Sequence, residues 1–420
     1  MALAVMPALA MAVTPHAAAA PPAILCTAGN PAGSAILSQV TTAVNDYYTK
    51  TPASPPNSPP NSTLLSAVAV AIVSPGKKAI VTCGTTAVGG GPAVDSKTLY
   101  EIGSETKMFT ATALAQMVLR KQVGLDDPLR NLIPQQYPLP DNTCQNPNPK
   151  PITLRMLATH NAGLPSDPKN ITWNDKKPQL RSDYTRTNLF ESFKVGYAKP
   201  CNALMSTPGT KYFYSDWGFA LLGAALADKY RPGQAIPPFG PMVGDLVTGP
   251  LGMVSTILEP SVLPLNSATP TCILPIVTPC QWNNTNAFAG GGGMVSNIED
   301  MATFVGANLG FQREAGVYPA LQMTQRPWGF GPQCPSNPNC EGLAWDLAPI
   351  GSGDNPSQYF VTLNKDGGTN GFHSNTFIQP AACWGSTFLS NSSTNVGVNL
   401  TGFAGAIIRA LQPTSSKSLC

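Results

Sequence analysis

Apolar and polar residues alternate at both ends of this chain, whereas its middle follows a helical period or no regular period. Alternation with a period of two is typical of half-buried strands. Near the N-terminus it predicts strands at Leu65–Val73, Ala79–Cys83 and Leu99–Ile102, the first two joined as a hairpin around Pro75-Gly76. Near the C-terminus it predicts three more strands: Gly371–Ile378, Ser386–Ser390 and Val396–Thr401.

Helical patterns occupy other parts of the sequence. The stretch Met108–Leu119 is apolar on nearly every side, which indicates a helix buried in the core. Ser296 and Glu299 have the spacing of a capping box, which predicts a helix from there through Ala307. Further helices are predicted at Ala32–Tyr48, Thr153–Thr159, Phe219–Tyr230 and Phe403–Leu411.

These elements predict an α/β (α+β) fold. An antiparallel sheet would be built from both termini and flanked by helices, with a large, mainly helical region inserted. The sheet region would cover about residues 30–103 and 361–412, and the helical region about residues 104–360, within one domain spanning 21–420. A substrate site would lie between the two regions.

The composition excludes some functions. Charged residues make up 11% of the 420 residues, against about 25% in typical soluble proteins. The net charge of +3 and the absence of a basic run exclude a nucleic-acid-binding protein. The 43 prolines and 38 glycines predict long loops.

Ten cysteines are scattered along the chain without a Cys-x-x-Cys motif, and there are only three histidines. This pattern argues against a zinc site and favours disulfides in an oxidising compartment; the alternative is ten free thiols in a cytosolic protein. The closely spaced pairs Cys272–Cys280 and Cys334–Cys340 are predicted first, followed by Cys144–Cys201 and Cys26–Cys83.

The first twenty residues are rich in Ala, Met, Val and Leu and end in an alanine run that a signal peptidase could cleave. They lack a basic segment, so they are either a clipped signal peptide or a misplaced start. Leu25 stands before Cys26, where a lipoprotein signal needs a small residue, so no lipid anchor is predicted. No later stretch is long and apolar enough for a transmembrane helix. The predicted location is periplasmic or secreted.

Ser104 and Lys107 stand three residues apart at the predicted start of the buried helix. One helical turn brings such residues onto the same face. Free N–H groups and the helix dipole favour a developing negative charge at Ser104, and a partly desolvated Lys107 would be the base that activates its hydroxyl. The alternative is an ordinary first turn with a solvated lysine. A second Ser-x-x-Lys, Ser74–Lys77, spans the Pro-Gly turn and is interpreted as a hairpin loop.

Tyr214-Ser215-Asp216 precedes the helix predicted at Phe219. Tyr214 would relay a proton, and Asp216 would hydrogen-bond Lys107 or a substrate amide. The alternative is an aromatic anchor followed by an aspartate that caps the helix.

Lys365-Asp366-Gly367-Gly368-Thr369 stands at the edge of a predicted strand. Glycines there let a substrate lie against bare backbone. Lys365 would hold a carboxylate, and a backbone N–H would face an oxyanion. The alternative is a glycine-rich hairpin turn.

The three motifs, in this order, resemble the serine β-lactamase and penicillin-binding protein superfamily, specifically its class C β-lactamase-like branch. That branch carries Ser-x-x-Lys, Tyr-x-Asn and then Lys-x-Gly or His-x-Gly. The resemblance covers residues 63–411, and Cys280–Thr285 is similar to a segment of periplasmic D-alanyl-D-alanine carboxypeptidase/endopeptidases. Other segments similar to the family are Leu125–Leu129, Thr153–Pro165, Pro250–Met253 and Gly290–Phe304.

The resemblance implies acyl transfer without a cofactor or metal. Ser104 would attack a carbonyl, Lys107 and Tyr214 would shuttle protons, and water would hydrolyse the acyl-enzyme. Which of Lys107 and Tyr214 is the main base stays open. The N–H groups of Ser104 and Gly368 would form the oxyanion hole. The remaining substrate-binding positions would be Asp216, Lys365, Gly367 and Thr369.

Two positions depart from the family pattern. Asp216 stands where the family usually has Asn, and Asp366 stands where many class C β-lactamases have Thr. Both place an acid where an anionic substrate would lie. His160 matches a family position that looks structural, and His373 has no assigned role.

Three functions stay open at this point. The first is a D-alanyl-D-alanine carboxypeptidase/endopeptidase that acts on peptidoglycan peptides and binds penicillin. The second is a class C-like β-lactamase or a carboxylesterase on the same scaffold, because fold and nucleophile do not fix the substrate. The third is a non-catalytic extracytoplasmic binding protein.

Overall fold

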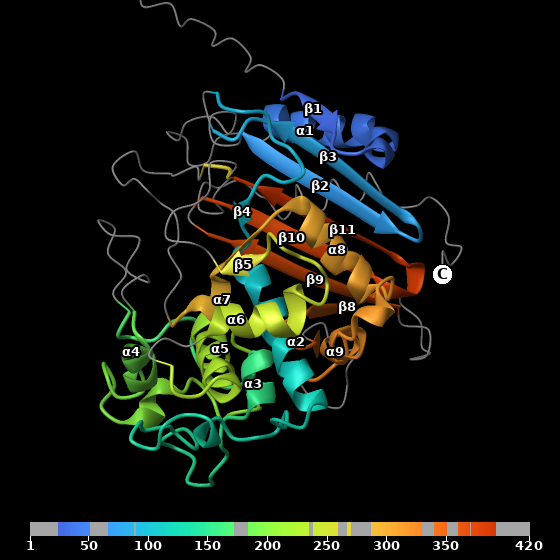
Figure 1. Ribbon diagram of the computed structural model, residues 1–420. Helices are drawn as coiled ribbons and strands as arrows, with labels where there is room; N and C mark the ends of the chain where they lie inside the picture. Colours follow the sequence, from blue (N-terminus) through green and yellow to red (C-terminus); the bar gives the residue numbers. More distant parts are fainter. Residues whose placement is uncertain are drawn as a thin grey trace, which may run out of the picture.

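The structure is a computed structural model that describes residues 24–50, 66–87, 90–171, 184–234, 238–258, 267–269, 287–329, 340–350, 360–369 and 371–391. A sheet and a helical region lie side by side (Figure 1). The sheet contains strands from both ends of the chain, and α2, α3 and α5 lie together below it in this view. The predicted α/β (α+β) architecture is therefore confirmed.

Within the described residues, eight strands form the main sheet in the order β1-β3-β2-β11-β10-β9-β8-β7. Every neighbouring pair is antiparallel. The strands are β1 (Cys26–Ala28), β2 (Ala67–Ser74), β3 (Lys77–Gly84), β7 (Cys340–Glu341), β8 (Asp346–Ile350), β9 (Phe360–Gly368), β10 (His373–Gln379) and β11 (Trp384–Ser390).

The β2–β3 hairpin shows how alternation builds two faces. Val68, Val70 and Val81 are fully buried on the face covered by α1 (Leu37–Lys50). The residues between them, such as Ala69, belong to the larger core on the opposite face, against which α8 (Ile298–Asn308) packs. Period-two alternation places successive side chains on opposite faces, so this sheet is buried on both sides here.

The predicted strand at Leu99–Ile102 exists but pairs elsewhere. It is reduced to β4 (Tyr100–Glu101), which pairs with β6 (Met294–Ser296), and β6 pairs in turn with β5 (Ile257–Leu258). These strands form a separate three-stranded sheet. The prediction that β4 belongs to the main sheet was wrong, because the sequence of a two-residue strand does not specify its partner.

The helical region contains the helices predicted at residues 108, 153 and 219, each with slightly shifted ends. All residues of α2 from Thr106 to Met117 are buried, as its uniformly apolar sequence predicts. Besides α1 and α8, the α-helices of the described residues are α2 (Thr106–Leu119), α3 (Leu154–Ala158), α4 (Arg186–Glu191), α5 (Asp216–Tyr230), α6 (Phe239–Val243), α7 (Ala289–Gly292) and α9 (Tyr318–Thr324). Short 3-10 helices lie at Pro31–Ala35, Gly103–Glu105, Leu129–Asn131, Pro200–Ala203, Arg313–Ala315 and Pro380–Ala382, and a π-helical turn at Gly244–Thr248.

Two further expectations need correction. Strands β7 and β8 belong to the main sheet although the sequence analysis placed them in the helical region. Helix α8 is capped by Asn297, whose side chain accepts from the Asp300 N–H at 2.9 Å, rather than by Ser296. The strand predicted at 396–401 and the helix predicted at 403–411 lie outside the described residues.

The disulfides Cys26–Cys83 and Cys144–Cys201 are present as predicted. Cys340 and Cys383 are also disulfide-bonded, and the described part of the chain has no free cysteine, so the free-thiol alternative is wrong. The predicted pairs Cys272–Cys280 and Cys334–Cys340 involve cysteines outside the described residues.

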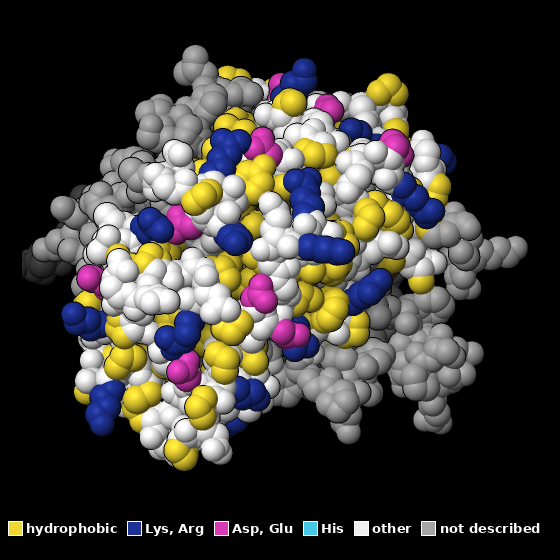
Figure 2. All heavy atoms as spheres, turned by 60° about the horizontal axis from the view of Figure 1, so that its bottom comes forward, with side chains coloured by type: hydrophobic (Ala, Val, Ile, Leu, Met, Phe, Trp, Pro, Cys, Tyr) yellow, Lys and Arg dark blue, Asp and Glu magenta, His cyan; other side chains and the backbone are white. Residues whose placement is uncertain are grey.

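Two observations concern the surface and the membrane. Figure 2 shows Lys/Arg and Asp/Glu side chains scattered among apolar and neutral ones on the face that it presents, without one continuous patch of basic side chains among the described residues. None of the helices in the described ranges is long and apolar enough to cross a membrane.

Candidate active site

The turn that carries Ser104 is shaped by glycine. Residues Gly103–Glu105 form a single 3-10 turn that leads directly into α2. Gly103 has φ +49°, and a Cβ atom there would lie 2.7 Å from both the backbone N and O of Gly368. Such a contact is too short for any other residue, and the left-handed region favours glycine. The absence of a side chain therefore lets the end of β9 pack directly against the residue before Ser104.

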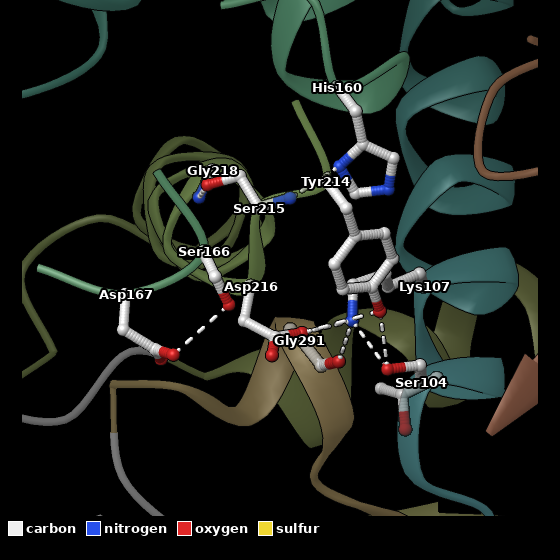
Figure 3. A network of polar contacts seen from close by, with 12 residues as sticks. Ser104, Lys107, His160, Ser166, Asp167, Tyr214, Ser215, Asp216, Gly218 and Gly291 are labelled. Carbon is white, nitrogen blue, oxygen red and sulfur yellow. Dashed lines mark hydrogen bonds and ion pairs between the residues drawn. The ribbon is translucent and has the colours of Figure 1, made fainter. Parts of the chain in front are cut away.

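Lys107 lies one turn further along, with its side chain fully shielded from solvent. Its Nζ atom donates to Ser104 Oγ at 2.8 Å, to Asp216 Oδ1 at 2.5 Å and to the Gly291 carbonyl at 2.5 Å (Figure 3). The burial of α2 on all sides explains why this lysine is held inside the protein, and its charge is balanced there by the Asp216 carboxylate.

Tyr214 lies beside Lys107 (Figure 3), and its hydroxyl donates to Ser104 Oγ at 2.6 Å. Ser215 caps α5 by accepting from the Gly218 N–H at 2.9 Å, and its own N–H donates to His160 Nδ1 at 3.0 Å. The His160 ring lies 4.5 Å from the Tyr214 ring, centroid to centroid. These contacts fix the backbone around Ser215 and therefore the direction in which the side chains of Tyr214 and Asp216 point.

His160 is held neutral. Burial lowers its pKa well below the ordinary value, and the nearby Lys107 and Lys365 act in the same direction. A neutral imidazole can accept the Ser215 N–H at Nδ1. His160 thus supports the Tyr214 segment, in agreement with the structural role expected from the sequence.

Lys365, on β9, is 3% exposed and lies beside Tyr214, with its Nζ 5.5 Å from the ring centroid. It donates to the Asp366 carbonyl at 2.9 Å and to Asp366 Oδ1 at 3.1 Å. Burial alone would lower the pKa of Lys365, but Asp366, Tyr214 and Asp346 outweigh it and raise the pKa well above the ordinary value. Lys365 is therefore a cation whose hydrogen bonds already go to its own neighbour.

The glycine motif lies where the sequence analysis expected it. A Cβ atom at Gly367 would lie 2.0 Å from the Ile102 carbonyl, so β9 runs directly against the Ser104 turn. Gly368 is the residue that packs on Gly103. Thr369, by contrast, is 4% exposed, and its hydroxyl accepts from the Gly371 N–H at 3.4 Å, which makes it part of the turn between β9 and β10.

Two groups at this site were missed by sequence reasoning. The Gly291 carbonyl, which accepts from Lys107, belongs to a glycine-rich segment recognised only as similar to the family. Glu105 follows Ser104 and is fully buried; burial raises its pKa to about 8, although the Thr376 and Ser374 hydroxyls and Lys365 oppose that shift. Glu105 could have been noticed in the sequence, because it is a charged residue beside the candidate nucleophile at the start of an apolar run.

The arrangement can perform one kind of chemistry directly. A serine hydroxyl contacts two groups that can exchange protons with it, at a helix start and beside glycine backbone. This is the geometry of an activated nucleophile with an oxyanion site nearby.

A sequence profile of the Beta-lactamase family matches residues 62–406. This chain belongs to the beta-lactamase family. The match includes all three motifs that form the site, and the family comprises serine hydrolases such as β-lactamases and DD-peptidases.

Individual relatives are distant. The D-alanyl-D-alanine-carboxypeptidase/endopeptidase AmpH of Escherichia coli is 28% identical over 271 residues, which cover 60% of this chain and 61% of AmpH. Beta-lactamase-like protein 4 of Dictyostelium discoideum is 27% identical over 316 residues, covering 71% of this chain and 52% of that protein. The chain thus spans about three fifths of the length of the E. coli relative and about half of the other.

Solved structures of the family share the fold. A class C β-lactamase superposes with a TM-score of 0.68 at 20% identity, covering 92% of this chain and 99% of the other. A β-lactamase/D-alanine carboxypeptidase from Pseudomonas syringae gives a TM-score of 0.67 at 21% identity, covering 90% and 99%. This similarity shows that the fold is shared, and a shared fold does not determine the substrate.

Proposed function

We propose that this protein is a periplasmic or secreted serine hydrolase that forms an acyl-enzyme on Ser104 and acts on peptidoglycan peptides ending in D-Ala-D-Ala. The observation that carries the proposal is the double contact on Ser104 Oγ, from Lys107 Nζ at 2.8 Å and from the Tyr214 hydroxyl at 2.6 Å. Similarity to the E. coli carboxypeptidase/endopeptidase supports the choice of substrate, and the disulfides support an oxidising location.

In the proposed reaction, Ser104 Oγ attacks the carbonyl carbon of the penultimate D-Ala. Its proton passes to a neighbouring base, and the N–H groups of Ser104 and Gly368 stabilise the oxyanion. The peptide C–N bond then breaks as the leaving amine takes a proton. Water attacks the acyl-enzyme by the same route in reverse, which releases the product acid and restores Ser104.

Ser104→Ala should abolish covalent labelling by a penicillin or by a serine-directed phosphonate. The expected result is one adduct on wild type in an intact-mass measurement, located on Ser104 by peptide mapping, and none on the variant. The matched control is Ser74→Ala, which removes the serine of the other Ser-x-x-Lys sequence at the β2–β3 turn and should label like wild type. Labelling that persists in Ser104→Ala would overturn the proposal, and a wild type that neither labels nor hydrolyses would favour a binding protein.

A carboxylesterase is the second candidate, because the Lys365–Asp366 pair disfavours anionic substrates. A D-Ala-D-Ala peptide and a β-lactam both carry a carboxylate that needs a cation. Lys365 is the cation that the motif offers, and it is bonded to Asp366. Lys365 lowers the pKa of Asp366 to about 2, against the opposing effect of burial. Asp366 therefore stays ionised throughout the usual assay range, and a substrate carboxylate must compete with it.

Asp366→Thr should increase the hydrolysis of a chromogenic cephalosporin and of a D-Ala-D-Ala peptide about fivefold or more, and should leave a short-chain neutral ester unchanged. Because the Asp366 side chain is 51% exposed, its pairing is screened by solvent and is assigned only about 1 kcal/mol, or roughly a factor of five. Asp141→Thr, which removes an exposed partner of Arg130, serves as the control. Fast cephalosporin hydrolysis by wild type with no gain from Asp366→Thr would make β-lactamase the better assignment.

A further inference from the structure

Glu105 is a buried acid directly after the candidate nucleophile. It is the last residue of the 3-10 turn that carries Ser104, and its side chain is fully shielded from solvent. The turn packs against β9, β10 and α7 and continues into α2. A Cβ atom at Gly367 would lie 3.1 Å from the Glu105 N and 2.5 Å from Ser374 Oγ. Glu105 therefore lies where the Ser104 turn meets β9 and β10.

The hydrogen bonds around this side chain favour its uncharged form. Neither carboxyl oxygen of Glu105 has a hydrogen-bond partner within the described ranges. An ionised carboxylate only accepts hydrogen bonds, and the hydroxyls beside it, those of Ser374 and Thr376, already donate elsewhere. Ser374 donates to the Ile102 carbonyl at 2.9 Å, and Thr376 donates to the Thr387 hydroxyl at 3.0 Å. A protonated carboxyl group has an O–H of its own, which it can donate to the lone pairs of those same oxygens.

The titratable groups on the neighbouring elements do not reverse this preference. On β9, Lys365 favours ionisation of Glu105 and Asp366 opposes it, and the two are paired with each other. On α2, Lys107 is itself in an ion pair. On β10, His373 is neutral because burial lowers its pKa to about 4, and α7 has no titratable side chain. Burial is the largest effect, and it raises the pKa of Glu105 to about 8.

We propose that Glu105 is a positioning residue whose uncharged carboxyl group keeps the Ser104 turn in contact with β9 and β10, so that its ionisation ends acylation at alkaline pH. The inference rests on the proposed acyl-enzyme function. A carboxylate at this place needs a donor, and the Ser374 hydroxyl can serve only by leaving the Ile102 carbonyl. That bond ties β10 to the residue that precedes the turn. Its loss loosens the turn on the sheet, and with it the spacing of the Ser104 and Gly368 N–H groups that form the proposed oxyanion site.

An ionised Glu105 also opposes the reaction electrostatically. The attack on the acyl carbon places a negative charge on the oxygen that the N–H groups of Ser104 and Gly368 hold. A second negative charge on the residue after Ser104, shielded from solvent, repels it. Both effects have the same sign: acylation is supported while Glu105 holds its proton and is lost as the pH rises through the pKa of this carboxyl group.

The rate at which a neutral phosphonate modifies Ser104 in wild type should fall about tenfold or more between pH 7 and pH 9.5, because a group with a pKa of about 8 rarely keeps its proton at the higher pH. Glu105→Gln has a side chain of the same shape that cannot ionise, so its fall should begin about one pH unit higher or more. Each rate is measured by intact mass and corrected for the reagent's own hydrolysis. The matched control is Glu314→Gln, which removes an exposed glutamate and should keep the wild-type profile.

A second measurement does not depend on activity. Glu105 is protonated in the folded protein at neutral pH and ionised in the unfolded chain, so wild-type stability falls as the pH rises from the ordinary glutamate pKa to the raised one. Glu105→Gln lacks this loss, so its denaturant midpoint relative to wild type should rise between about pH 5 and pH 8 and stay level above that range. Glu314→Gln should show no such change. Glu105→Met, which needs no hydrogen-bond partner, should behave like Glu105→Gln, and circular dichroism checks that both variants are folded.

The acyl-enzyme function and the role of Glu105 can fail separately. If the phosphonate labels Ser104→Ala as well as wild type, the acyl-enzyme function fails, whereas the stability difference can still be read. If Ser104 is the labelled residue but Glu105→Gln keeps the wild-type fall at alkaline pH, the role assigned to Glu105 is wrong. A stability difference that does not change with pH would also overturn it, since Glu105 would then be ionised in the folded protein. An equal effect of Glu314→Gln would do the same, because the effect would then reflect net charge alone.

Discussion

Lys107→Ala and Tyr214→Phe should each slow the acylation of Ser104 by a factor on the order of 10²–10⁴, the usual contribution of a positioned acid–base group. Both groups contact the nucleophile oxygen directly. Lys107→Ala removes the amine that contacts Ser104 Oγ at 2.8 Å, and Tyr214→Phe removes the hydroxyl that contacts it at 2.6 Å. The rate is followed by intact mass with a labelled penicillin at a fixed concentration.

Two matched controls accompany these variants. Tyr230→Phe removes a tyrosine hydroxyl at the far end of α5, where it donates to Asp245 Oδ2 at 3.1 Å, and Lys229→Ala removes an exposed lysine in the last turn of the same helix. Both should acylate like wild type. Wild-type rates in Lys107→Ala or in Tyr214→Phe would exclude that residue from the reaction.

The loss of Lys107 also has a structural cost that must be separated from catalysis. Removing one member of a buried ion pair destabilises a protein by about 3–5 kcal/mol, because the other charge is left without a partner. Lys107→Ala combined with Asp216→Asn should recover part of that free energy of unfolding. Acylation should stay slow in the double variant, because neither replacement restores the amine that contacts Ser104 Oγ.

The parts of the fold predicted from the sequence are those with a strong local pattern. The β2–β3 hairpin combines alternation with a Pro-Gly turn, and α2 is apolar over three turns. Strand β7, at the edge of the sheet, is two residues long, and its neighbour β8 contains a proline and an acid. Neither strand therefore shows a regular alternation of apolar and polar residues. The partner of β4 depends on contacts with residues almost 200 positions away, which no local pattern encodes.

The site shows the same division. The spacing of Ser104 and Lys107 and the order of the three motifs were sufficient to predict that these two side chains and Tyr214 lie together. The Gly291 carbonyl could not be predicted, because its position depends on the close packing of α7 on α5. A Cβ atom at Gly223 would lie 2.8 Å from the Gly290 Cα, so glycine at both positions allows that approach. Asp366 was expected where an anionic substrate would lie, and its pairing with Lys365 was not predicted.

Gly103→Ala should reduce acylation more than 100-fold while leaving the protein folded. The added Cβ atom would lie 2.7 Å from the backbone N and O of Gly368, and backbone atoms cannot move aside as the end of a side chain can. The turn that carries Ser104 and the end of β9 must therefore separate. Because the proposed oxyanion site uses the N–H groups of Ser104 and Gly368, a displacement of about 1 Å there is enough for a 100-fold loss.

Gly76→Ala is the matched control for this variant. Gly76 has φ +67°, also in the left-handed region, but a Cβ atom there would meet nothing within 4 Å. Gly76→Ala should lower the free energy of unfolding by about 1–2 kcal/mol through backbone strain alone, and Gly103→Ala should lower it further because of the contact with Gly368. Denaturant titration measures both, and only Gly103→Ala should impair acylation. If Gly103→Ala acylates at the wild-type rate, the contact between the Ser104 turn and β9 is not needed for the reaction, and the Gly368 N–H is not part of the oxyanion site.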